Sequence, residues 1–88
     1  LAEKFFAWYG EVFEEGALTS REKALIALGV AHAIQCPYCI DAYTQELVGM
    51  GESKEGMMEA VHVAGAIRGG ASLVHGVQMM GKADQMSM

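Results

Sequence analysis

The chain has 88 residues, enough for one domain, so residues 1–88 are interpreted as a single domain. Hydrophobic residues make up 52% of it, more than so short a chain can bury alone, which favours packing against further copies of itself. Eleven acidic residues against six basic ones argue against nucleic acid and against anionic membrane surfaces as partners. No apolar run approaches the roughly 20 residues that span a bilayer, and the N-terminus lacks a signal-peptide pattern. We therefore expect a cytoplasmic protein without a membrane partner.

The first predicted helix covers residues 2–15 and ends at Gly16. One face of it is apolar at helical spacing, formed by Phe5, Trp8, Tyr9, Val12 and Phe13. Thr19 followed three residues later by Glu22 is a capping-box pattern, and it predicts a second helix that runs to about residue 35. From residue 24 to residue 34 only His32 is polar, so this helix is expected to be buried all round, partly against other subunits.

The only proline, Pro37, predicts the start of a third helix with Cys36 at its N-cap. Glycines at 49 and 51 should end that helix. Ser53 can cap a fourth helix, which the pair at 69–70 should weaken or kink. A last helix is expected over about 71–81, followed by a frayed tail over 82–88. No segment alternates like a strand, so the predicted fold class is all-α.

Both cysteines of the chain belong to the sequence Cys36-Pro-Tyr-Cys39. Residues three apart share a helix face, so the two thiols can meet as a disulfide at a helix start. Free backbone N–H groups and the positive end of the helix dipole favour a thiolate there, and the cap position favours Cys36 as the more activated thiol. A closely spaced pair without a signal peptide points to a redox or metal role. In the redox case one thiolate attacks a peroxide or disulfide, the other closes the internal disulfide, and a reducing partner reopens it.

Two further side chains are candidates for proton transfer at this pair. His32 lies four residues before Cys36 and can act as a base or relay, although a hydrogen-bonded core histidine is an equal alternative. Tyr43 lies four residues after Cys39 on the same helix face, and its hydroxyl can donate to the site or hold a water; the alternative is a packing residue.

Residues 22–28 (Glu-Lys-Ala-Leu-Ile-Ala-Leu) and 36–42 (Cys-Pro-Tyr-Cys-Ile-Asp-Ala) resemble the carboxymuconolactone decarboxylase / alkyl hydroperoxidase D (AhpD-like) family. The stretch from residue 58 to residue 71 is similar to the family's following helices. The resemblance implies an all-helical AhpD-like domain that assembles as trimers or hexamers. It also implies a thiol peroxidase or disulfide reductase in which Cys39 attacks the peroxide and Cys36 resolves. The family's decarboxylase branch does not work through a cysteine pair, which disfavours lactone decarboxylation.

Two positions depart from the family's proton-relay pattern. Tyr43 stands where the family has a histidine, and Ala24 stands where it has a glutamate; Glu22, two residues earlier, faces another way. His32 is therefore the candidate for the missing base.

The function expected from the sequence is a thiol-dependent peroxidase or disulfide oxidoreductase with Cys39, Cys36, His32 and Tyr43 at its site. Its partners would be a hydroperoxide or disulfide substrate, a dithiol reductant protein and further copies of the chain, with no cofactor. The alternative is a helical binding protein without turnover, either one that holds a metal through His32, Cys36 and Cys39 or one whose disulfide only reports redox state.

Overall fold

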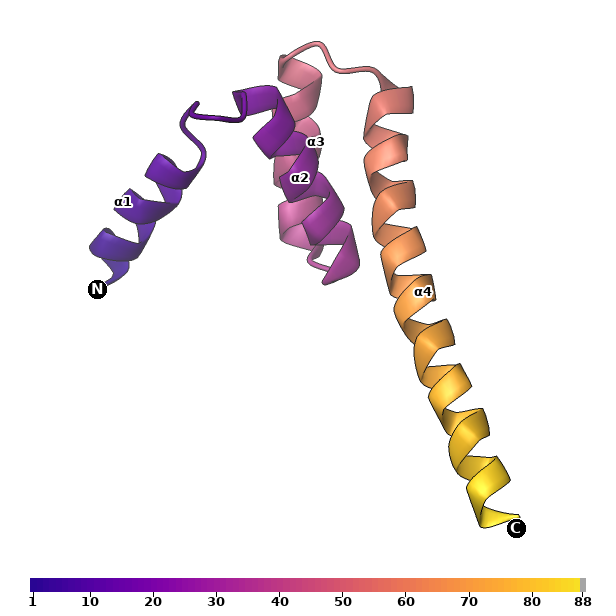
Figure 1. Ribbon diagram of the computed structural model, residues 1–88. Helices are drawn as coiled ribbons and strands as arrows, with labels where there is room; N and C mark the ends of the chain where they lie inside the picture. The colour runs from indigo at the N-terminus through magenta and orange to yellow at the C-terminus, as the bar shows by residue number, and fades with distance from the viewer. Residues whose placement is uncertain (88) are drawn as a thin grey trace.

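A computed structural model describes residues 1–87, and its regular elements are all α-helices. They are α1 (Ala2–Val12), α2 (Ser20–Ala33), α3 (Pro37–Gly49) and α4 (Lys54–Met86). Helix α2 packs against both α3 and α4, while α1 stands on the opposite side of the α2–α3 pair from α4 (Figure 1). The predicted all-α class is confirmed.

The core lies between α2 and α3. Ala24 and Leu28 of α2 meet Tyr43 and Leu47 of α3, and both leucines are almost completely inaccessible to solvent. Partly buried apolar side chains surround this cluster, and Cys39 is one of them. The core therefore fixes the first turns of α3, which carry the cysteine pair, against α2.

The helix starts follow the capping residues predicted from the sequence. The Thr19 hydroxyl accepts the Glu22 backbone N–H while the Glu22 carboxylate accepts that of Thr19, so the capping box is confirmed. Ser53 caps α4 by accepting the Gly56 N–H at 3.0 Å. Arg68 of α4 donates to the carbonyl oxygen of Ala33 at 2.7 Å, which ties α4 to the end of α2.

Three predicted helix boundaries are wrong. Helix α1 ends at Val12 rather than residue 15, and the helices expected on either side of residues 69–70 form one continuous α4. A glycine in a helix interior costs about 1 kcal/mol relative to alanine. The cost of two glycines is smaller than the stability that the helical residues on both sides provide, so the helix continues through them. The tail predicted to be frayed is helical to Met86, while residue 88 lies outside the described residues.

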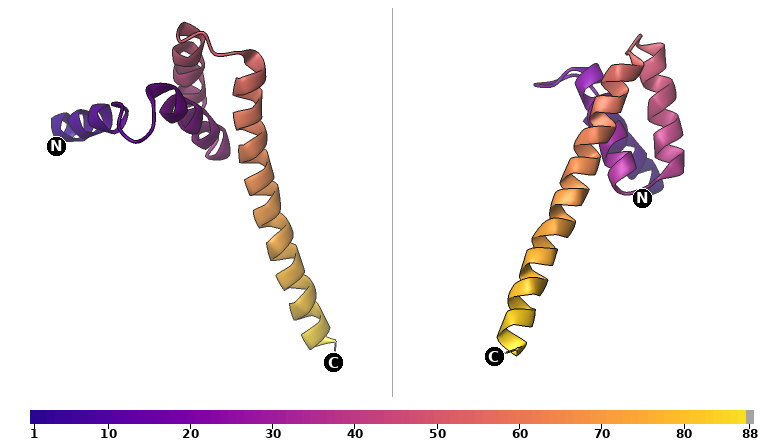
Figure 2. Two further views of the ribbon diagram at one scale, coloured as in Figure 1. Left: turned by 45° about the horizontal axis from the view of Figure 1, so that its top comes forward. Right: turned by 90° about the vertical axis from the view of Figure 1, so that its right-hand side faces the viewer.

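Large apolar surfaces remain uncovered in the single chain. Ile26 and Val30 of α2 are each 52% exposed, so the all-round burial predicted for this helix does not occur within one chain. Helix α1 has no buried residue, and the C-terminal half of α4 projects beyond the other helices (Figure 2). None of the described helices, α4 included, is both long and apolar enough to cross a membrane.

Candidate active site

The cysteine pair follows a tight reversal between α2 and α3. Gln35 takes a left-handed conformation with φ of 57°. Its N–H bonds the carbonyl oxygen of His32 at 3.2 Å, and the N–H of Cys36 bonds that of Ala31 at 2.9 Å. This is the Schellman pattern of a helix end, in which glycine usually takes the left-handed position. The turn directs Cys36 out of α2 and into the cap of α3.

Cys36 is the N-cap of α3, as predicted, and Pro37 follows at the first helical position. The Cys36 sulfur accepts the backbone N–H of Cys39 at 3.3 Å, taking the place of the oxygen of a usual N-cap residue. Both thiols are free and half-buried in this structure. The helix start thus brings the two cysteines together and supplies an N–H group to the first sulfur.

The two thiols differ in acidity. The neighbouring Cys39 thiol, followed by the backbone N–H groups of Cys39 and Tyr38, holds the pKa of Cys36 below its ordinary value. The Cys36 sulfur and then burial raise the pKa of Cys39. These opposite directions favour Cys36 as the thiol that ionises first, as the cap position predicts. This differs from the division of roles that the family resemblance implies, with Cys39 as the attacking thiol.

Cys39 opens on an apolar groove of about 600 Å³ between α1, α2 and α3. Tyr43, 8% exposed and one turn after Cys39, lines the same groove. Burial, and then the adjacent Tyr9 hydroxyl, raise the pKa of Tyr43, so its hydroxyl stays protonated at neutral pH. The structure thus places Cys39 and Tyr43 at one groove, while Cys36 is joined to Cys39 through the hydrogen bond at the helix start.

Tyr9 of α1 is a neighbour that the sequence did not single out. Its hydroxyl is hydrogen-bonded to that of Tyr43, and it lines the same groove. The rings of Phe13 and Tyr43 stack with centroids 5.4 Å apart, and the rings of Tyr9 and Phe13 lie 5.1 Å apart in a tilted arrangement. The sequence showed Tyr9 only as part of an apolar helix face, which gives no signal for a partner 34 residues away.

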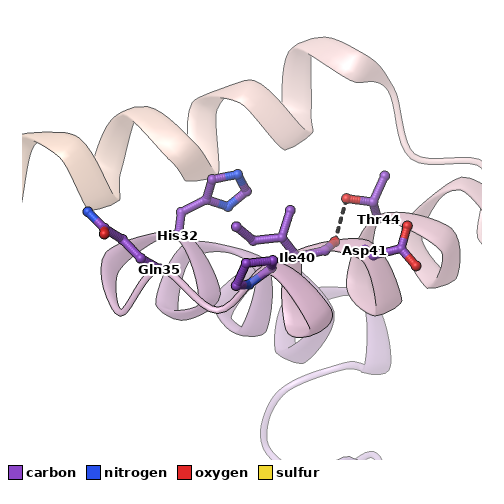
Figure 3. A pocket seen from close by; sticks show the side chains of 6 residues that line it. His32, Gln35, Ile40, Asp41 and Thr44 are labelled. Atoms are coloured by element: carbon purple, nitrogen blue, oxygen red, sulfur yellow. Dashed lines mark hydrogen bonds between the residues drawn. The ribbon is translucent and has the colours of Figure 1, made fainter.

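His32 lies at a different cavity. Its Nδ1 is 2.8 Å from the carbonyl oxygen of Leu28, and because a carbonyl oxygen can only accept, Nδ1 is the donor of this hydrogen bond. The cavity, of about 480 Å³, is lined by His32, Gln35, Pro37, Ile40, Asp41 and Thr44, and neither cysteine is among these residues (Figure 3). His32 is thus set apart from the groove of Cys39 and Tyr43.

The metal alternative finds no geometric support. Over residues 1–87 no three His, Cys, Asp or Glu side chains gather closely enough to hold a metal ion, so His32, Cys36 and Cys39 do not form a ligand set.

Comparisons with known proteins agree with this architecture. The sequence profile of the Carboxymuconolactone decarboxylase family matches residues 1–81. A relative from Paracoccus denitrificans, named Uncharacterized protein 4 in cox locus, is 38% identical over 84 residues, which span 96% of this chain and 76% of the relative. The crystal structure of a protein from Methanobacterium thermoautotrophicum superposes with a TM-score of 0.84 at 32% identity, covering 89% of this chain and 88% of that one. The chain therefore belongs to the carboxymuconolactone decarboxylase family.

Proposed function

We propose that the protein is a thiol-dependent oxidoreductase, a peroxidase or disulfide oxidoreductase, that works through Cys36 and Cys39. The observation that carries this proposal is the helix start itself: a sulfur at the N-cap accepts the N–H of the second cysteine, and the pKa of that first thiol is lowered. Thiolate character at a half-exposed cysteine pair is what disulfide exchange requires. Family membership supports enzyme activity in general, since the family includes both decarboxylases and AhpD-like peroxidases.

In the peroxidase reaction, the sulfur of Cys39 attacks the terminal oxygen of a hydroperoxide. A sulfur–oxygen bond forms, the oxygen–oxygen bond breaks, and the leaving alkoxide takes up the proton that the thiol released. The sulfur loses two electrons and the peroxide gains them, which leaves a sulfenic acid and an alcohol. Cys36 then attacks the sulfur of the sulfenic acid, a disulfide forms, and water leaves. Cys39 is assigned the first step because it lines the apolar groove.

Cys36 is assigned the exchange with other thiols. It is the more acidic of the two, and the N-cap position keeps it at the helix end, where a disulfide or a reductant can approach. A dithiol reductant protein attacks the Cys36–Cys39 disulfide at Cys36 and releases the thiolate of Cys39. Its second thiol then frees Cys36 and leaves the reductant as a disulfide, so that electrons and protons balance over the cycle.

Tyr43 and His32 have separate roles in this proposal. Tyr43, in the groove of Cys39, is the hydrogen-bond donor to the reacting atoms, since its raised pKa keeps its proton in place. His32 lines a cavity beside the turn that precedes Cys36, and Cys39 is not part of that cavity. Any proton transfer by His32 would therefore take place there and not in the groove of Cys39.

Self-association is part of the same proposal. Apolar side chains on α1 and α4 are more than half exposed in the single chain, among them Trp8 at 60%, Ile67 at 70% and Leu73 at 73%. Exposed apolar surface of this extent marks an interaction site, and a second copy of the chain is its simplest occupant. Sedimentation of the purified protein should show a trimer or hexamer. A monomer at micromolar concentration would contradict this part of the proposal.

The test is consumption of a hydroperoxide and of a protein disulfide by the wild type and by Cys36→Ser and Cys39→Ser, each supplied with a dithiol reductant. Loss of turnover in both variants supports the proposal. Full activity of Cys39→Ser would overturn the assignment of Cys39. Reversible oxidation of the wild type without turnover would instead favour a redox-responsive binding protein.

A further inference from the structure

The groove beside Cys39 offers few polar side chains. Of the residues that line it, only Tyr9, Lys23, Cys39 and Tyr43 carry polar atoms in their side chains. The Lys23 ammonium donates to the carbonyl oxygens of Val12 and Glu14, at 2.8 and 2.5 Å, and so is directed at the chain that follows α1. The two tyrosine hydroxyls are therefore the polar groups left to act on the Cys39 sulfur.

The two hydroxyls are not equivalent. Tyr43 belongs to α3, is 8% exposed and lies one turn from Cys39. Tyr9 belongs to α1, is 39% exposed, and bonds the Tyr43 hydroxyl. When Tyr9 donates to the Tyr43 oxygen, the Tyr43 proton is free for another acceptor, and in this groove the Cys39 sulfur is the remaining side-chain acceptor.

We propose that Tyr9 is a positioning residue of the thiol site: its hydroxyl orients the Tyr43 hydroxyl as a hydrogen-bond donor to the Cys39 thiolate. This inference rests on the proposed function, because it assigns to Cys39 a thiolate that must form in an apolar groove. A thiolate among apolar side chains is costly unless a donor is fixed beside it. Helix α1, which has no buried residue, would thus complete the site through one hydroxyl.

The charged and titratable groups around this sulfur come from three helices. Cys36 at the N-cap of α3 acts on Cys39 directly, whereas Glu46 of α3 acts on Tyr43. Lys23 of α2 and Tyr9 of α1 line the same groove. Cys36 is the strongest of these influences on Cys39, so it has to be removed before the effect of the hydroxyls is measured.

The experiment measures alkylation of Cys39 by iodoacetamide as a function of pH in a Cys36→Ser background. Tyr9→Phe keeps the ring and removes only the hydroxyl. Tyr38→Phe is the matched control, because Tyr38 is 83% exposed and lines neither the groove of Cys39 nor the cavity of His32. At neutral pH we expect Tyr9→Phe and Tyr43→Phe each to slow alkylation by roughly three- to tenfold, the range of one ordinary hydrogen bond. Tyr38→Phe should leave the rate unchanged.

Two comparisons separate positioning from loss of structure. The double variant Tyr9→Phe/Tyr43→Phe should be no slower than Tyr43→Phe, because Tyr9 acts through Tyr43. At a pH where Cys39 is fully ionised, the slowing should vanish, whereas a change in access to the groove would persist at every pH. An unchanged profile for Tyr9→Phe, additive effects in the double variant, or slowing that persists at high pH would each overturn the inference.

The measurement uses neither peroxide nor reductant. A wild type that turns over no substrate would therefore refute the proposed function while the alkylation profiles still decide the role of Tyr9. If the Cys36→Ser chain does not fold, the same variants are compared with both cysteines present, and alkylation at Cys39 is read by peptide mass.

Discussion

Leu47→Ala tests whether the small core between α2 and α3 is what holds the thiol site in place. The Leu47 side chain is completely buried and contacts the cluster of Ala24, Leu28 and Tyr43. Truncation of a buried leucine to alanine costs about 2–5 kcal/mol, because apolar contacts are lost and a cavity remains. Ala24 has only a methyl group to offer, and Leu28 and Tyr43 already pack in the same cluster, so these neighbours do not refill the space. We therefore expect a loss of about 2–4 kcal/mol.

A loss of this size is a large fraction of the total. At about 0.05–0.15 kcal/mol per residue, a chain of 88 residues has a free energy of unfolding of about 4–13 kcal/mol. The assay is urea unfolding followed by helical circular dichroism at several protein concentrations, since self-association raises apparent stability. Val48→Ala is the matched control: Val48 is the residue after Leu47 within α3 but is 60% exposed, so its truncation should change stability by less than about 0.5 kcal/mol. Equal effects of the two substitutions would refute the packing account.

Three further predictions concern the thiols, an ion pair and a helix cap. In the reduced wild type, iodoacetamide should modify Cys36 before Cys39, because the pKa of Cys36 is lowered and that of Cys39 is raised; equal rates by peptide mass would contradict this. The Arg21 guanidinium, 2.7 Å from the carboxylate of Glu52, holds the folded-state pKa of Glu52 below its ordinary 4.5. Ionised Glu52 therefore stabilises the folded state at pH values above 4.5, and this contribution is lost as the pH falls through the folded-state pKa. Glu52→Gln should flatten the acid side of a plot of unfolding free energy against pH. Thr19→Ala should lower the free energy of unfolding by about 0.5–2 kcal/mol in the same urea assay, and no change would contradict the capping role.

Local chemistry explains which features could be predicted from the sequence. The caps at Thr19, Cys36 and Ser53 were correct, because each depends on a side chain and backbone groups only three residues away. The all-α class followed from helical spacing and the lack of alternation. By contrast, the turn that ends α2 depends on Gln35, which takes a left-handed conformation. Glycine is the usual residue at such a position, so a glutamine there gave no signal of the turn and the turn was not predicted.

Features that depend on tertiary packing were predicted less well. Tyr43 was selected for its spacing from Cys39, and the structure places both at one groove. His32 satisfies the same spacing rule toward Cys36, yet it lines another cavity, because the tight turn after α2 interrupts the helical register between them. Tyr9 was missed because it is 34 residues away from Tyr43 in the sequence, and only the tertiary fold brings α1 next to the site. The glycine pair at 69–70 led to the prediction of two helices where the structure has one continuous α4. That prediction failed because the low helix propensity of two residues is a weak guide inside a long helix.

The most direct test of a redox-active Cys36–Cys39 pair is the product formed when the reduced protein reacts with one equivalent of a hydroperoxide and no reductant is present. We predict loss of both free thiols and a Cys36–Cys39 disulfide, found by peptide mass. In Cys36→Ser we predict a sulfenic acid at Cys39 that a carbon nucleophile can trap, because the resolving thiol is gone. Two thiols that remain reduced after exposure to the peroxide, or oxidation of Cys36 alone in the wild type, would contradict this prediction.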